Sequence, residues 1–202
     1  MPYIIHPRQM RKMVAALFCA ALLVVTVPAV ASAACPSSPA AALLEKFGDN
    51  AAYSVLTGSS FESGAPGWSL SGAEVTNGPG VDGNSGLLVI QPDGEVVSPA
   101  FCVSSEYPSF RFFARQVSDG GGYGWFSGLN VSLRWTDMHG WRHDTNVADL
   151  RPGSTWTLSP VLRLASALPL WMRGNSLNVS LVLQANGGSW AVDGVFIDPY
   201  RR

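Results

Sequence analysis

Two histidines and two aspartates fall within the short stretch from Asp137 to Asp144. Imidazole and carboxylate groups are ligands for zinc, and a third ligand from elsewhere would complete the site of a metal-dependent hydrolase. Asp137 and Gly140 are also residue types that a four-residue turn prefers between two antiparallel strands. That turn places His139 at its tip and His143 on the following strand, so the two rings do not converge. The sequence favours this hairpin, and the zinc hydrolase is kept as an alternative.

Other catalytic patterns are missing from the sequence. No serine stands in the glycine-flanked elbow of hydrolases, and the glycine-rich run 120–124 lacks the lysine of a phosphate-binding loop. This run is typical of a connection between strands. We therefore expect a protein that is not an enzyme.

Sugar binding is a second chemistry that these side chains would support. If the segments 111–116 and 129–135 are neighbouring strands, joined by the glycine-rich run, their outer residues form one surface. Guanidinium and amide groups would bond to sugar hydroxyls, arginine forks would pair with carboxylates, and aromatic rings would stack on sugar rings. The ligand-binding candidates on this surface are Arg111, Phe113, Arg115, Asn130, Ser132 and Arg134, with Trp125 and Trp141 beside them.

A simpler interpretation of the same residues stays open. The seven tryptophans would then mostly fill the core, and Arg111 and Arg115 would pair with acidic residues such as Glu106 or Asp119. In that case the outer surface would have no sugar site.

Short strands, rather than helices, must position these residues. From Tyr53 onward, runs rich in Val, Leu, Phe and Trp alternate with Gly, Pro, Asn, Asp and Ser, as in antiparallel all-β domains. Within 129–135 every second residue is apolar, and 111–115 and 177–184 alternate in a similar way. Further strands are expected at 68–71, 87–90, 95–98, 141–147, 156–158 and 190–197. This pattern predicts two antiparallel sheets packed face to face in a β-sandwich, most simply a jelly roll.

The N-terminus has the organisation of a cleavable signal peptide. A basic lead ends at Lys12, an apolar run covers 13–27, and Ala31-Ser32-Ala33 fits the small-x-small pattern before a cleavage site. An uncleaved membrane anchor is the alternative, but a spanning helix needs roughly 20 apolar residues and this run is shorter. We expect a secreted, extracellular protein that has no membrane association after cleavage.

Three regions follow from this organisation. Residues 1–33 form the signal peptide, and residues 34–52 form an N-terminal arm in which Leu43, Leu44 and Phe47 have the spacing of a short helix. Residues 53–202 form the β-sandwich domain. Once the signal peptide is removed, about 170 residues remain, enough for one hydrophobic core.

The charge balance argues against nucleic acid as a partner. The chain has 13 basic and 14 acidic residues, and three of the basic ones lie within residues 1–33, which leaves 10 against 14, or a net charge of −4. A mildly acidic domain without a basic run is a poor match for nucleic acid or for anionic membranes.

Two cysteines, Cys35 and Cys102, remain after cleavage. In an oxidising compartment an even pair predicts one disulfide, which would tie the arm to the domain and stabilise it by roughly 4 kcal/mol. The alternative is that Cys35 carries a lipid, since Ala34 before it is small. That modification usually requires a leucine at the position where this chain has Ser32.

Segments at the two ends of the domain resemble a known family. Near its start are Ser60-Phe61-Glu62-Ser63-Gly64 and Gly67-Trp68, and near its end is Trp190-Ala191-Val192-Asp193-Gly194. These are similar to the ends of carbohydrate-binding jelly rolls with a galactose-binding-like fold. Arg111–Arg115 and Pro99-x-x-Cys102-Val103 resemble a group of uncharacterised secreted proteins from high-GC Gram-positive bacteria.

The resemblance implies a structural calcium ion. In such modules the opening glutamate and the closing aspartate meet because the first and last strands are neighbours, and backbone carbonyls supply further oxygens. By position these residues are Glu62 and Asp193. Gly194 stands where a second aspartate often occurs, which weakens the implied site. The alternative is that Glu62 caps a turn and Asp193 accepts backbone hydrogen bonds.

Two functional hypotheses from different classes remain. The first is a non-catalytic extracellular binding module whose partner is an extracellular or cell-wall polysaccharide. The second is a structural or protein-interaction domain of the cell envelope without a sugar site. A groove lined by exposed aromatic rings would favour the first hypothesis, and a flat, polar surface without rings would favour the second.

Overall fold

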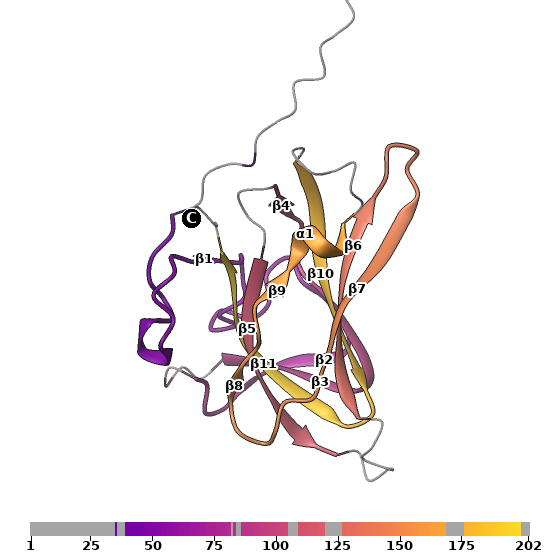
Figure 1. The fold of residues 1–202 in the computed structure, drawn as a ribbon. Coiled ribbons are helices and arrows are strands. Elements are labelled where there is room, and N and C mark those ends of the chain that lie inside the picture. Colours follow the sequence, from indigo (N-terminus) through magenta and orange to yellow (C-terminus); the bar gives the residue numbers. More distant parts are fainter. Residues whose placement is uncertain are drawn as a thin grey trace, which may run out of the picture. The chain divides into compact units, whose positions relative to one another are not determined.

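The computed structural model describes residues 35, 39–81, 83, 86–104, 109–119, 127–168 and 176–198 (Figure 1). All of these belong to one compact unit, Ser32–Arg202. The signal peptide expected at residues 1–33 lies outside the described residues. No helix within the described part of the chain is long and apolar enough to cross a lipid bilayer.

Alternating apolar and polar residues produce strands throughout the domain. The longer strands are β2 (Ser69–Asn77), β3 (Gly86–Val97), β5 (Ser109–Ser118), β6 (Gly128–Thr136), β7 (Arg142–Leu150), β10 (Leu177–Asn186) and β11 (Ser189–Asp198). The shorter ones are β1 (Ser54–Val55), β4 (Phe101–Val103), β8 (Thr157–Leu158) and β9 (Leu162–Arg163). Two helical turns, η1 (Glu45–Phe47) and α1 (Leu164–Ala167), complete the described elements.

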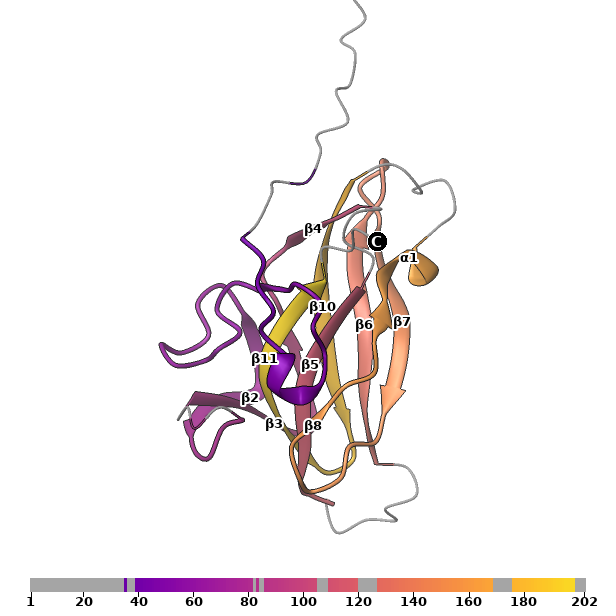
Figure 2. The same cartoon turned by 60° about the vertical axis from the view of Figure 1, so that its left-hand side comes forward.

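The strands pair in the order β7-β6-β10-β3-β11-β5-β8, and every pairing is antiparallel. Strands β7, β6 and β10 lie in one layer, and β11, β5 and β8 in the other (Figure 2). Strand β3 links the layers, because residues 95–97 pair with β10 and residues 88–90 pair with β11. The predicted all-β sandwich of the jelly-roll type is therefore confirmed.

A backbone bend lets β3 serve both layers. Asp93 has a φ of 62°, and β2 has a bulge between Ser71 and Ala73 at the same level. A side chain on Gly94 would collide with the carbonyl oxygen of Gly72, so the two glycines allow the bent strands to approach closely. The segments 87–90 and 95–98, predicted as two strands, are consequently the two halves of one bent strand.

The main core lies between the layers. The alternate residues Leu129, Val131, Leu133 and Trp135 of β6 face it, as predicted, and Phe112 and Ala114 of β5 face it from the other layer. Trp190, Phe61 and Trp68 fill the same core. The local period of two therefore predicted correctly which side of each of these strands faces the main core.

The N-terminal arm differs from the sequence expectation. A helix was predicted, but the arm contains only the single 3-10 turn η1, which ends at Gly48 with a φ of 80°. Leu44 is buried against Tyr53 and Phe113, whereas Leu43 and Phe47 are partly exposed. A single turn offers too few hydrogen bonds to propagate a helix. The apolar spacing therefore reflects the packing of the arm on the second layer.

The disulfide between Cys35 and Cys102 is present, with a Cα–Cα distance of 5.4 Å. It joins the start of the arm to β4, which itself pairs with β10. This prediction from the cysteine count is confirmed.

Candidate binding face

Five strands carry polar side chains on the side away from the main core, and we call this surface the polar face. Alternation fixes its direction, since the intervening residues Val96, Leu183 and Val131 lie in the core. The register gives three rows across the strands: Ser71, Glu95, Gln184, Asn130 and Asp149; Ser69, Val97, Val182, Ser132 and Asn146; and Ser180, Arg134 and Asp144. Adjacent strands are ~4.8 Å apart, so the first row extends about 19 Å.

Hydrogen bonds order the side chains of the polar face. Asn130 donates from Nδ2 to Oδ1 of Asp149 at 2.8 Å, and its own Oδ1 accepts from the Ser132 hydroxyl at 2.9 Å. The middle row adds Val97 and Val182 between these groups. Val97 is half-buried and Val182 is buried, so Val97 is the apolar side chain that the centre of the face presents between two rows of hydrogen-bonding groups.

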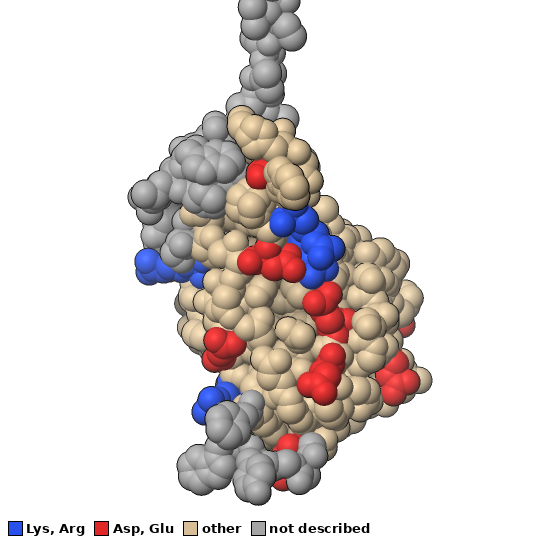
Figure 3. All heavy atoms as spheres, turned by 90° about the vertical axis from the view of Figure 1, so that its right-hand side faces the viewer, with Lys and Arg blue, Asp and Glu red and all other residues tan. Residues whose placement is uncertain are grey.

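Arg134 is the basic side chain of the three rows, and two carboxylates hold it. Its Nε and Nη2 donate to the two carboxylate oxygens of Asp144, each at 2.8 Å, and its Nη1 and Nη2 lie 3.3 and 3.4 Å from Oε1 of Glu95. The hydrogen bonds from Arg134 hold the pKa of Asp144 below its ordinary value, against the opposing effect of burial. On the side of the molecule shown in Figure 3, acidic side chains lie next to and below a group of basic ones in the upper half of the surface.

Only part of the predicted sugar surface is found on the polar face. Asn130, Ser132 and Arg134 belong to it, but Arg111, Phe113 and Arg115 lie on β5, in the other layer. The prediction that segments 111–116 and 129–135 are neighbouring strands is wrong. Strand β5 pairs with β11 on one side and with β8 and β9 on the other, which leaves no edge for β6.

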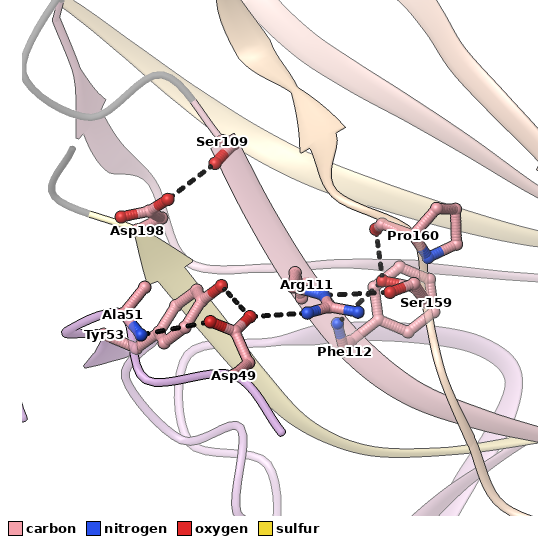
Figure 4. A network of polar contacts seen from close by, with 9 residues as sticks. All are labelled: Asp49, Ala51, Tyr53, Ser109, Arg111, Phe112, Ser159, Pro160 and Asp198. Carbon is pink, nitrogen blue, oxygen red and sulfur yellow. Dashed lines mark hydrogen bonds and ion pairs between the residues drawn. The ribbon is translucent and has the colours of Figure 1, made fainter. Parts of the chain in front are cut away.

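Arg111 ties the N-terminal arm to β5 (Figure 4). Its Nη1 donates to Asp49 Oδ2 at 2.5 Å, and its Nε donates to the carbonyl oxygen of Ser159 at 3.0 Å. Tyr53 donates its hydroxyl to the same Asp49 oxygen at 2.6 Å, and burial together with this bond raises the pKa of Tyr53 to about 12. An acidic partner for Arg111 was foreseen as an alternative, and among the described residues that partner is Asp49. Glu106, one of the two acids suggested from the sequence, lies outside the described residues.

Phe113 and Arg115 are also engaged within the protein. Phe113 is buried, with its ring centroid 4.6 Å from that of Phe47 on the arm. The guanidinium of Arg115 stacks over Trp156 at 5.0 Å, and its buried Nε has no hydrogen-bond partner among the described residues. The arm and Trp156 therefore cover the outer side of β5, which is not an open sugar surface.

The hairpin between β6 and β7 is the one that the sequence predicts. Oδ1 of Asp137 accepts the backbone N–H of His139 at 2.8 Å and that of Trp141 at 2.9 Å, and Gly140 closes the turn on the Asp137 carbonyl. His143 bonds to Asp137 Oδ2 at 2.9 Å. In the described part of the chain, no three His, Cys, Asp or Glu side chains are grouped closely enough to hold a metal ion.

The structure describes only one of the two tryptophans predicted beside the sugar-binding surface. Trp125 lies outside the described residues. Trp141 is 70% exposed at the hairpin, and alternation places it on the side of Trp135 rather than on the side of Arg134.

Glu62 and Asp193 lie close enough for their charges to interact, next to the paired first and last strands. Asp193 Oδ2 accepts the backbone N–H of Val81 at 2.9 Å, and Glu62 Oε1 accepts that of Gly86 at 3.0 Å. Burial raises the pKa of Asp193, the Val81 hydrogen bond opposes this, and the charge of Glu62 raises it further. Backbone hydrogen bonding, the alternative to calcium, is present, and a cation between these two carboxylates would relieve their repulsion.

Several members of the polar face were not predicted as site residues. Glu95, Gln184 and Asp149 reach the face from three different strands, which only the pairing brings together. The sequence offered one usable signal, namely that Asn178, Ser180 and Gln184 alternate with the apolar residues of the segment 177–184.

Comparison with solved structures finds the same fold in xylan-binding modules. The CBM22-1 xylan-binding domain of Paenibacillus barcinonensis Xyn10C is 14% identical, with a TM-score of 0.53 over 74% of this chain and 97% of that domain. The tandem CBM22-1–CBM22-2 domain of the same protein is 16% identical, with a TM-score of 0.53 over 72% of this chain and 44% of the tandem. The CBM22-1–GH10 modules of Clostridium thermocellum Xyn10B, complexed with xylohexaose, are 11% identical, with a TM-score of 0.50 over 71% of this chain and 27% of theirs.

No protein-family model and no curated protein matches the sequence. At identities this low, the structural likeness establishes the fold, and function has to be argued from the site.

Proposed function

We propose that this protein is a non-catalytic extracellular binding module that binds an extracellular or cell-wall polysaccharide on the polar face. The observation that carries this proposal is the set of three rows across five strands, on a fold shared with xylan-binding modules. The outer side of the other layer is not a candidate where the arm lies on it.

The chemistry of the polar face suits an extended glycan that runs across the strands. The side chains of Gln184 and Asn130 offer donors and acceptors to sugar hydroxyls, and the half-buried Val97 offers apolar contact to the C–H groups of the rings. The strand spacing of ~4.8 Å is close to the rise per residue of an extended β-1,4-linked glycan, so successive strands would meet successive sugars.

The carboxylates of the polar face support binding rather than cleavage. Hydrolysis of a glycoside needs one carboxyl group as the acid and a second as the nucleophile or base. Asp144 is instead bonded to Arg134, and Asp149 to Asn130. The disulfide between Cys35 and Cys102 supports an oxidising, extracellular location.

One observation favours the second hypothesis, a structural or protein-interaction domain of the cell envelope. None of the residues in the three rows is aromatic, whereas ring stacking is a common contribution to sugar binding. In that case, the same amides and charges would contact a protein.

Affinity electrophoresis of the folded protein, with a panel of polysaccharides in the gel, tests the proposal. We expect retardation by at least one extended glycan, and at least a fivefold loss of affinity in Gln184→Ala and Asn130→Ala, about 1 kcal/mol or more for a lost hydrogen bond. Asn77→Ala, an exposed amide on β2 outside the three rows, is the control. Retardation that survives both substitutions would move the site away from the polar face, and no retardation by any glycan would favour the protein-interaction hypothesis.

A further inference from the structure

We infer that Asp144 is a specificity-determining residue, which makes the polar face select neutral glycans and reject those that carry carboxylates. This inference rests on the proposed function and adds the class of ligand. It starts from the contacts of Arg134.

An arginine on a sugar-binding surface is ordinarily the group that recognises an acidic sugar. Its planar fork donates two parallel hydrogen bonds to one carboxylate, as it would to a uronic acid. In this protein the fork is already filled, because Nε and Nη2 of Arg134 each bond to an oxygen of Asp144 at 2.8 Å. Glu95 lies against Nη1 and Nη2, on the side of the guanidinium toward β3.

The charges of the three rows lead to the same conclusion. Against the positive charge of Arg134 stand the carboxylates of Glu95, Asp144 and Asp149, so the rows carry a net charge of −2. Arg142, two residues before Asp144 on the same side of β7, reduces the net charge of the face to −1, and it too interacts with Asp144. A glycan carboxylate would meet this negative potential and would have to displace Asp144 to reach the arginine. Arg134 is only 20% exposed, which limits the access of a competing anion.

A neutral glycan is not repelled by the negative charge of the face and does not have to displace Asp144 from Arg134. Its hydroxyl groups are donors, and the oxygens of Asp149, Glu95 and Asp144 are acceptors on the surface of the face. Asp144, whose side chain is 41% exposed, keeps its bonds to Arg134 while it accepts from a hydroxyl, since a carboxylate has several lone pairs. The selected ligand class is therefore a neutral, extended glycan.

A matched pair of ligands tests this inference: glucuronoxylan, and the same polysaccharide after chemical reduction of its carboxyl groups. The wild-type protein should bind the reduced form more tightly. Asp144→Asn removes one negative charge and weakens the hold on the Arg134 fork, so the affinity for native glucuronoxylan relative to the reduced form should rise about tenfold. Asp93→Asn, which removes the same charge at an exposed position outside the rows, should leave this ratio within about twofold.

Salt provides a test that needs no variant. Repulsion between the face and the glycan weakens as salt screens it, so wild-type affinity for native glucuronoxylan should rise with ionic strength. Two results would overturn the inference and leave the proposed function standing. One is tighter binding of native than of reduced glucuronoxylan by the wild type, and the other is an equal change of this affinity ratio in Asp144→Asn and Asp93→Asn. Binding of neither form, nor of any other glycan, would instead overturn the proposed function.

Discussion

Asp49 on the N-terminal arm accepts a hydrogen bond from Arg111 on β5, and this pair lies where the sequence had suggested a sugar-binding arginine. The same carboxylate accepts from Tyr53 and from the backbone N–H of Ala51. These contacts fix the arm over the second layer of the sandwich (Figure 4). The polar face, in the other layer, is therefore the candidate surface that the arm does not cover.

Asp49→Ala should lower the free energy of unfolding by about 1.5–3 kcal/mol, because it removes hydrogen bonds to a charged group and leaves Arg111 without its carboxylate. Urea unfolding measures this loss, and limited proteolysis within residues 39–52 should become faster. Glu45→Ala on the same arm, at an exposed position, should change stability by less than about 0.5 kcal/mol. Equal effects of the two substitutions would mean that the Asp49 network does not hold the arm.

The Asp49 network also predicts a loss of stability in acid. Burial by itself raises the pKa of Asp49, but the hydrogen bonds from Tyr53, Ala51 and Arg111 outweigh it and the pKa is lowered. Its contribution is therefore present above the ordinary carboxyl pKa of 3.8 and is lost as the pH falls through the lower folded value. Unfolding free energies measured between about pH 5 and pH 2 should fall less steeply in Asp49→Asn than in the wild type. Parallel curves would show that this carboxylate is not linked to folding.

Loss of the disulfide should destabilise the protein. Cys35 and Cys102 are 67 positions apart, and on the chain-entropy model closing such a loop stabilises the fold by roughly 4 kcal/mol. Cys35→Ser should approach this loss in urea unfolding, and a reductant should affect the wild type but not the variant. Intact mass should show one disulfide and no free thiol in the exported protein. A diacylglycerol adduct on Cys35 would contradict the prediction.

Trp135→Ala should cost roughly 3–5 kcal/mol, as expected for a large aromatic residue in a packed core. Trp135 is 7% exposed, stacks on His143 with centroids 4.3 Å apart, and donates Nε1 to Thr145 at 3.1 Å. Trp141→Ala is the matched control, because that ring is 70% exposed, and its loss should cost less than about 0.5 kcal/mol. Similar values for the two tryptophans would place Trp135 outside the core.

The calcium ion expected from the family resemblance is tested by the pH and ion dependence of stability. If Glu62 and Asp193 hold calcium, the ion binds the folded state and the melting temperature rises with its concentration, an effect that magnesium reproduces poorly. Asp193→Asn should abolish most of this rise.

Without calcium, the ionised Asp193 carboxylate should destabilise the folded state at neutral pH instead of stabilising it. The raised pKa of Asp193 means that its contribution is present below the ordinary carboxyl pKa and is lost as the pH rises through the folded value. Asp193→Asn should then be at least as stable as the wild type at neutral pH in a chelator. A melting temperature that neither calcium nor a chelator changes would contradict the prediction that Glu62 and Asp193 hold a calcium ion.

Local patterns in the sequence determined which residues face the main core and how the chain turns. The period of two in 129–135 and 111–115 identified the core side of β6 and β5, since side chains alternate in any strand whatever its partner. The turn at Asp137 and Gly140 is local too, because both residues act on backbone groups within four positions. The disulfide followed from counting, since only two cysteines remain after the predicted cleavage.

The tertiary structure decided which outer faces come together. Backbone hydrogen bonds are nearly alike for any two strands, so the alternation in β5 and β6 does not say that β11 will take the place beside Arg111. That choice comes from packing the whole core, and it separates Arg111 from Arg134 while bringing Glu95, Gln184 and Asp149 together. The arm adds a second such decision, because Asp49 and Arg111 are 62 positions apart and meet only when the layers are assembled.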